Sequence, residues 1–153
     1  MRGQFATVLV GSIAAALLCA AGFAGAQETP IKQRMGENFA GMQIILSSLM
    51  TTRYAAAPDQ VAIIADHASY LLHAVPDSVR EDRDQFLVYA ANLQGHAHDL
   101  KSIIELLIEH DGARASDAML ETIDLREAAA AHYGGMAIMC VACHNHFRRQ
   151  VVR

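Results

Sequence analysis

Apolar residues recur at alternating steps of four and three positions in four stretches of the chain, the spacing of amphipathic helices. The first stretch follows Thr29-Pro30, which has the form of an N-cap residue and a proline at the first helical position. Asn38 is its one polar stripe member. The predicted stripe is Ile31, Met35, Asn38, Met42, Ile45 and Leu49, widened by Phe39 and Leu46.

The second and third stretches have equally regular apolar stripes. The second begins near Pro58 and is broken by Val75-Pro76, since proline cannot continue a helix. The third begins within the acidic run 81–84, which suits the positive end of a helix dipole, and ends at Asp111-Gly112. The predicted stripes are Val61, Ile64, Ala65, Ala68, Leu71 and Leu72, and then Phe86, Ala90, Leu93, Ala97, Leu100, Ile104 and Leu107.

The fourth stretch begins at Ser116, a favourable N-cap, and runs almost to the end of the chain. Its predicted stripe places Cys140 and His144 on the core-facing side and gives Arg126 a position that needs a partner. Gly134-Gly135 costs helix stability, about 1 kcal/mol per glycine relative to alanine. Either a flat ring approaches the backbone there or the glycines are simply tolerated. The full stripe is Met119, Ile123, Arg126, Ala130, Tyr133, Ala137, Cys140, His144, Phe147 and Val151.

Four amphipathic helices with short connections predict an all-α fold, an antiparallel up-down-up-down four-helix bundle that can hold a cofactor in its core. Aromatic residues make up only 6% of the chain and tryptophan is absent, which leaves room for a cofactor to supply apolar bulk.

The first 26 residues have the pattern of a secretory signal peptide. Met1-Arg2 is a short positive start, residues 5–21 are almost continuously apolar, and Ala24-Gly25-Ala26 fits the cleavage site. We therefore expect residues 1–26 to be removed and residues 27–153 to form one exported domain without stable membrane insertion. The alternative is a retained anchor, for which the apolar run is short.

The stretch Cys140-Val141-Ala142-Cys143-His144 is a C-x-x-C-H motif, which in an exported protein is typical of covalent c-type haem attachment. Two thiols three residues apart lie on one side of a helical turn, where each can add to a haem vinyl group. The adjacent imidazole of His144 can then bind the iron. Two alternatives are a pair of buried cysteines and a zinc site made by Cys140, Cys143, His144 and His146.

The charge of the chain limits its partners. Its formal net charge of −4 argues against nucleic acid as a ligand. No arrangement typical of a hydrolase occurs in the sequence, so we do not expect an enzyme.

The haem motif, the following Phe147-Arg148 and the opening segment 31–36 (Ile-Lys-Gln-Arg-Met-Gly) resemble those of class II c-type cytochromes, the cytochrome c′ family. The resemblance extends over residues 27–153 in length and helix order. It implies a periplasmic four-helix bundle, often a homodimer, with one covalent haem c on Cys140 and Cys143 and with His144 as proximal iron ligand. It also implies electron transfer with a redox partner protein, or binding of NO and CO where the sixth iron position is open.

The ligand on the other face of the iron must come from another helix. No methionine follows Cys143, and the methionines near His144 share its helix. In an antiparallel bundle Met35 lies at the depth of His144, whereas Met42 lies about 10 Å deeper. Met35 is therefore the candidate distal ligand, with Asn38 or an open site as the alternative. We expect the remaining histidines, His67, His73, His96, His98, His110 and His132, to be mainly solvated or capping, with His96 and His98 as alternative ligands.

Overall fold

A computed structural model describes residues 31–110 and 116–151, and all predictions that concern the signal peptide, its cleavage and the Thr29-Pro30 cap lie outside them. Residues 31–51 are helical and are called the first helix below. After it come η1 (Tyr54–Ala56), α2 (Ala57–His73), η2 (Asp77–Asp82), α3 (Arg83–His110) and α4 (Ser116–Val151). The described residues contain no strand, so the all-α prediction is confirmed.

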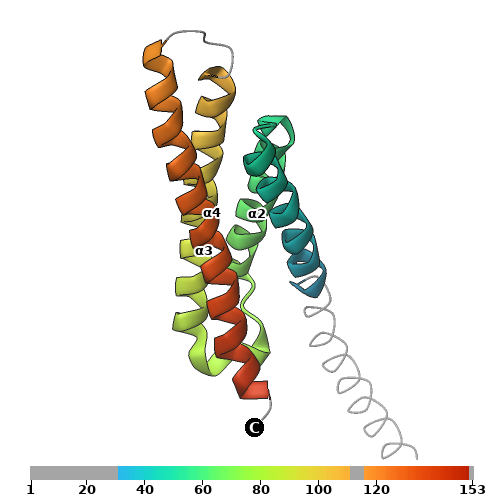
Figure 1. The fold of residues 1–153 in the computed structure, drawn as a ribbon. Helices are drawn as coiled ribbons and strands as arrows, with labels where there is room; N and C mark the ends of the chain where they lie inside the picture. The colour runs from blue at the N-terminus through green and yellow to red at the C-terminus, as the bar shows by residue number, and fades with distance from the viewer. Residues whose placement is uncertain (1–30, 111–115, 152–153) are drawn as a thin grey trace, which may run out of the picture.

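The four helices pack against one another, and α3 contacts both α2 and α4 (Figure 1). The first helix lies against α2, where Gly41 is buried. A Cβ atom at Gly41 would lie 3.4 Å from side-chain atoms of Gln60 and Ile64, so the two helices approach closely there. Within the part of the chain that the structure covers, no helix combines the length and the apolar character that crossing a membrane requires.

The buried residues form two clusters along the bundle. The larger cluster combines side chains of all four helices, among them Ile45, Ile64, Leu100 and Met136. The smaller cluster lies where α2 ends, α3 begins and α4 ends, and its buried members are Ile31, Leu71, Val79, Phe86, Ala90 and Phe147.

The predicted stripes of the first helix, α2 and α3 are confirmed, because their members are buried or half-buried. Two residues of the first helix differ from the prediction: Phe39 is 67% exposed and Leu46 is 43% exposed. The buried side of this helix carries Asn38, Ile45 and Ser48. Phe39 and Leu46 come directly after the first two of these residues, so their side chains point away from the core.

The predicted stripe of α4 is confirmed in part, because Tyr133, Cys140 and Phe147 are buried or packed against the core clusters. It is wrong at Ile123, Arg126, Ala130 and His144, which are exposed, and the side chains of Met119 and Val151 lie outside the described residues. Ala129 and Met136 are buried in place of Ala130 and Ala137, and Arg126 is exposed and so needs no buried partner. His144 is also exposed, whereas Cys143 packs against the smaller cluster. The many alanines of α4 would bury little apolar area on either side of the helix, so their spacing does not show which side faces the core. The large side chain of Met136 determines the buried side instead.

Gly134 and Gly135 differ in the space that surrounds them. A Cβ atom at Gly135 would lie 2.6 Å from the imidazole of His96 on α3, whereas a Cβ atom at Gly134 would meet nothing within 4 Å. A flat ring therefore does approach the backbone at Gly135, and that ring is a histidine. Gly134 is a tolerated glycine.

This difference predicts opposite effects of the same substitution at neighbouring positions. Gly134→Ala is expected to raise the free energy of unfolding by up to about 1 kcal/mol, because it adds helix propensity without a clash. Gly135→Ala is expected to lower it by up to about 2 kcal/mol, because the cost of moving the His96 ring, about 1–3 kcal/mol, outweighs the gain in helix propensity. Urea denaturation of the two variants measures both effects. Equal effects would show that His96 does not constrain Gly135.

Candidate functional site

One cavity of about 330 Å³ opens between the helices at the junction of the two core clusters, within the ~300–1,000 Å³ range of ligand pockets. Leu93 and Cys140 on its wall belong to the larger cluster, and Phe86 and Cys143 belong to the smaller one. The walls are mostly apolar, which suits a largely apolar ligand. The lining residues are Met35, Asn38, Phe39, Leu71, Phe86, Tyr89, Ala90, Leu93, Met139, Cys140, Val141, Cys143, His144 and Asn145.

The α4 wall of the cavity carries the motif predicted to hold the cofactor. Cys140, Cys143 and His144 occupy positions i, i+3 and i+4 of the helix, so their side chains share one side of it. All three line the cavity. The two thiols are free, with no disulfide between them, and so both sulfur atoms are available for other bonds.

Burial changes the acid–base behaviour of these thiols. It raises the pKa of the Cys140 thiol above its usual value. Burial, with a smaller contribution from the neighbouring Cys140, raises the pKa of Cys143 to about 11. Both groups are therefore neutral thiols at physiological pH, which is the form that the apolar cavity favours.

The first helix supplies the wall with Met35, Asn38 and Phe39. Met35 is half-buried and packs against the smaller cluster, as Cys143 does. Met42 instead packs against the larger cluster and is absent from the cavity wall. Met35, which was predicted to lie at the same depth as His144, therefore lines the same cavity as His144, and Met42 does not.

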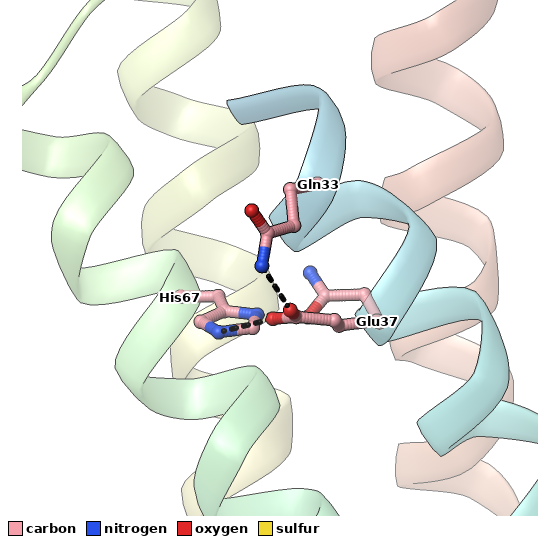
Figure 2. A network of polar contacts seen from close by, with 4 residues as sticks. Gln33, Glu37 and His67 are labelled. Carbon is pink, nitrogen blue, oxygen red and sulfur yellow. Dashed lines mark hydrogen bonds and ion pairs between the residues drawn. The ribbon is translucent and has the colours of Figure 1, made fainter. Parts of the chain in front are cut away.

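His67 of α2 is only 7% exposed, so the prediction that it is solvated is wrong. Its Nδ1 lies 2.6 Å from Oδ1 of Asn38, which is also buried. Its Nε2 lies 3.4 Å from Oε2 of Glu37, whose other carboxylate oxygen accepts a hydrogen bond of 2.8 Å from Gln33 (Figure 2). The imidazole is buried because the first helix offers it polar partners on both nitrogens.

The buried position of His67 predicts that acid destabilises the fold. Burial first, and the positive charge of Arg34 second, lower the pKa of His67 below 6.5, and these effects outweigh the opposing influence of Glu37, Asp66 and the Arg34 backbone. Below pH 6.5 the unfolded chain therefore binds more protons here than the folded chain. The free energy of unfolding is expected to fall as the pH drops from 6.5 toward the folded-state pKa.

Urea denaturation between pH 7.5 and 5 measures this effect. His67→Gln, which cannot titrate, is expected to show a flatter dependence on pH than the wild type. His98→Gln removes an exposed histidine and is expected to leave the dependence unchanged. A wild-type profile as flat as that of His67→Gln would contradict the prediction.

Apart from His144, none of the described histidines lines the cavity. His96 and His98, the alternative ligands, do not line it. His96 is engaged with α4 instead, since its Nδ1 lies 3.4 Å from Nδ1 of His132, which in turn lies 3.6 Å from Asp99. His96 and His132 are therefore half-buried partners and not solvated residues as expected.

The four residues of the zinc alternative are not gathered around one point. His146 lies 3.4 Å from Asp82 and stacks edge-on with Tyr89 and Phe147. On a helix it lies two positions beyond His144 and so points to another side. Among the described residues no three His, Cys, Asp or Glu side chains come together as a metal-holding group.

Several cavity residues were not singled out from the sequence as site residues, among them Tyr89, Met139 and Asn145. Phe86, Ala90 and Leu93 could have been placed there, because their stripe on α3 faces the helix that carries the motif. Compared with protein families, with curated proteins and with solved structures, the chain matches none of them.

Proposed function

We propose that this chain is a periplasmic haem protein of the cytochrome c′ type that transfers electrons through one covalently bound haem c. The observation that carries the proposal is a single apolar cavity shared by Cys140, Cys143 and His144 on one wall and by Met35 on another. We propose further that the helices form an antiparallel up-down-up-down bundle around the haem.

The residues of the cavity fit this group by their chemistry. Cys140 and Cys143 are free thiols three positions apart, and each would hold the haem through a thioether bond. The imidazole of His144 is the proximal ligand in this proposal, and the thioether of Met35 is the candidate distal ligand. When bound, the haem would supply a one-electron couple at its iron.

The remaining residues of the site would influence the reduction potential of the haem and the access of a redox partner to it. Phe86, Leu93 and Leu71 give the cavity apolar walls, which would lower the dielectric around the iron and so tune its reduction potential. His144, Val141 and Asn145 are exposed at the rim, so a redox partner protein can approach the cavity from the α4 side. The periplasmic location and a homodimeric state rest on the sequence resemblance.

Binding of NO or CO is the second candidate function, and the observation that favours it is Asn38. Asn38 is a polar group on an otherwise mostly apolar cavity wall, on the same helix as Met35. An iron without Met35 would offer its sixth position to a diatomic gas beside that amide.

The absorption spectrum of the purified mature protein, oxidised and then reduced with and without CO, tests the proposal. Electron transfer with Met35 bound predicts low-spin iron that takes up CO poorly. Gas binding predicts high-spin iron that takes up CO readily. A colourless protein would overturn both, and a stoichiometric zinc content would favour the metal-site alternative.

A further inference from the structure

His96 on α3 and His132 on α4 form a pair of half-buried imidazoles outside the cavity that carries the haem motif. The two helices pack against each other (Figure 1). The Nδ1 atoms of the two rings face each other at 3.4 Å. Asp99, one helical turn after His96, places its Oδ2 3.6 Å from Nδ1 of His132. Two imidazole nitrogens therefore meet at the junction of two helices, with a carboxylate beside them.

The spacing of these atoms is long for hydrogen bonds, which are typically about 2.7–3.2 Å between nitrogen and oxygen. Two facing Nδ1 atoms can also share at most one proton, whichever tautomers the neutral rings adopt. By contrast, Zn–N bonds of about 2.0–2.1 Å in a tetrahedral site place two ligand nitrogens about 3.3–3.4 Å apart. The 3.4 Å between the two Nδ1 atoms is thus the separation of neighbouring zinc ligands.

The backbone of α4 at Gly135 holds His96 in this orientation. A Cβ atom at Gly135 would lie 2.6 Å from Cε1 and Nε2 of the His96 ring and 2.8 Å from its Cδ2. The ring therefore occupies the space that a side chain would fill, and its Nδ1 faces His132. A ligand that is already oriented loses less conformational entropy when it binds. Gly135 is accordingly a positioning residue for His96.

We propose that His96 and His132 bind a divalent transition-metal ion and so bridge α3 and α4, with Zn²⁺ as the ion that their spacing fits best. Imidazole is a ligand that such ions favour. Asp99 contributes a negative charge close to the ion. The described residues contain no set of three metal-holding side chains, so water completes the coordination. This site is separate from the proposed haem and does not depend on it.

Calorimetric titration of the haem-loaded protein with ZnCl₂ at pH 7.5, after treatment with a chelator, tests the inference. Loss of an outer hydrogen-bond partner of a metal ligand weakens binding about 10- to 100-fold, so His96→Gln and His132→Gln are each expected to weaken zinc binding by at least about 10-fold. His98→Gln removes an exposed histidine from the same helix as His96 and is expected to leave the affinity unchanged.

Two glycine variants separate a positioned pair of ligands from general attraction of the ion to histidine. Gly135→Ala keeps both imidazoles but displaces the His96 ring, so it is expected to weaken zinc binding, whereas Gly134→Ala is expected to have no effect. Zn²⁺ is also expected to raise the urea midpoint of the wild type, because it binds the folded chain across two helices, and not that of either histidine variant. Urea curves without zinc establish that each variant is folded during the titration.

The inference is overturned if the wild type does not bind zinc, or if both histidine variants bind it as tightly as the wild type. Zinc held by Cys140 and Cys143 would give the second of these results, since neither histidine lines their cavity. Protein without haem allows the same comparison of variants. Failure of the proposed function, seen in the haem spectrum, is therefore distinct from failure of this inference.

Discussion

Replacing both Cys140 and Cys143 with alanine is expected to abolish covalent haem attachment. In the wild type, haem should stay with the protein through denaturation and acid–acetone extraction, and the intact mass should equal residues 27–153 plus one haem. Both thiols line the cavity, and neither forms a disulfide with another described residue. Each single variant keeps one thioether bond and is expected to retain haem less firmly.

Val141→Ala is the matched control, since Val141 lies on the same turn and lines the cavity but carries no thiol. It is expected to retain the full haem content. Intact-mass spectrometry of the three cysteine variants and this control measures the effect. Loss of haem from wild-type protein on extraction would contradict covalent attachment.

Replacing Met35 with alanine is expected to convert a closed iron site into an open one. If the Met35 sulfur binds the iron, the ferric wild type is low-spin and shows a weak sulfur-to-iron charge-transfer band, and Met35→Ala loses that band. Removal of an internal ligand that competes for the iron is expected to raise the apparent CO affinity on the order of 10- to 100-fold.

Met42→Ala controls for the loss of a methionine from the same helix. Met42 packs against the larger core cluster and is absent from the cavity wall, so its removal lowers stability but leaves the band and the CO affinity unchanged. High-spin iron and avid CO binding already in the wild type would show that Met35 only packs. Gas binding beside Asn38 would then be the better description of the site.

The parts of the fold that could be predicted are those where large apolar residues set the phase of a helix. The stripe on α3 from Phe86 to Leu107 is buried at every predicted position, because leucine, isoleucine and phenylalanine gain most from burial. On α4 the corresponding positions are largely alanines and glycines, which gain little, so the true face could not be recognised before the neighbours of Met136 were known.

The residues that carry the proposed chemistry could be predicted from the sequence, but the polar residues packed behind them could not. The motif and the depth argument identified four residues that the structure brings to one cavity, Cys140, Cys143, His144 and Met35. The burial of His67 was not predictable, because it depends on a partner 29 positions earlier in the sequence, Asn38, and on Glu37 beside it. A polar residue on one helix stripe is a signal to look for a second polar residue on the facing helix.

The burial that raises the pKa of Cys143 also predicts that this thiol reacts more slowly in the folded chain than in the unfolded one. Because burial raises the pKa of Cys143 to about 11, very little of this thiol is a thiolate at neutral pH, and we expect the folded chain to react slowly with oxidants and alkylating agents at this position. The same protonation makes the thiol a slow nucleophile. If haem is attached to Cys143 as proposed, we expect the attachment to be faster before the helices close around this thiol than afterwards.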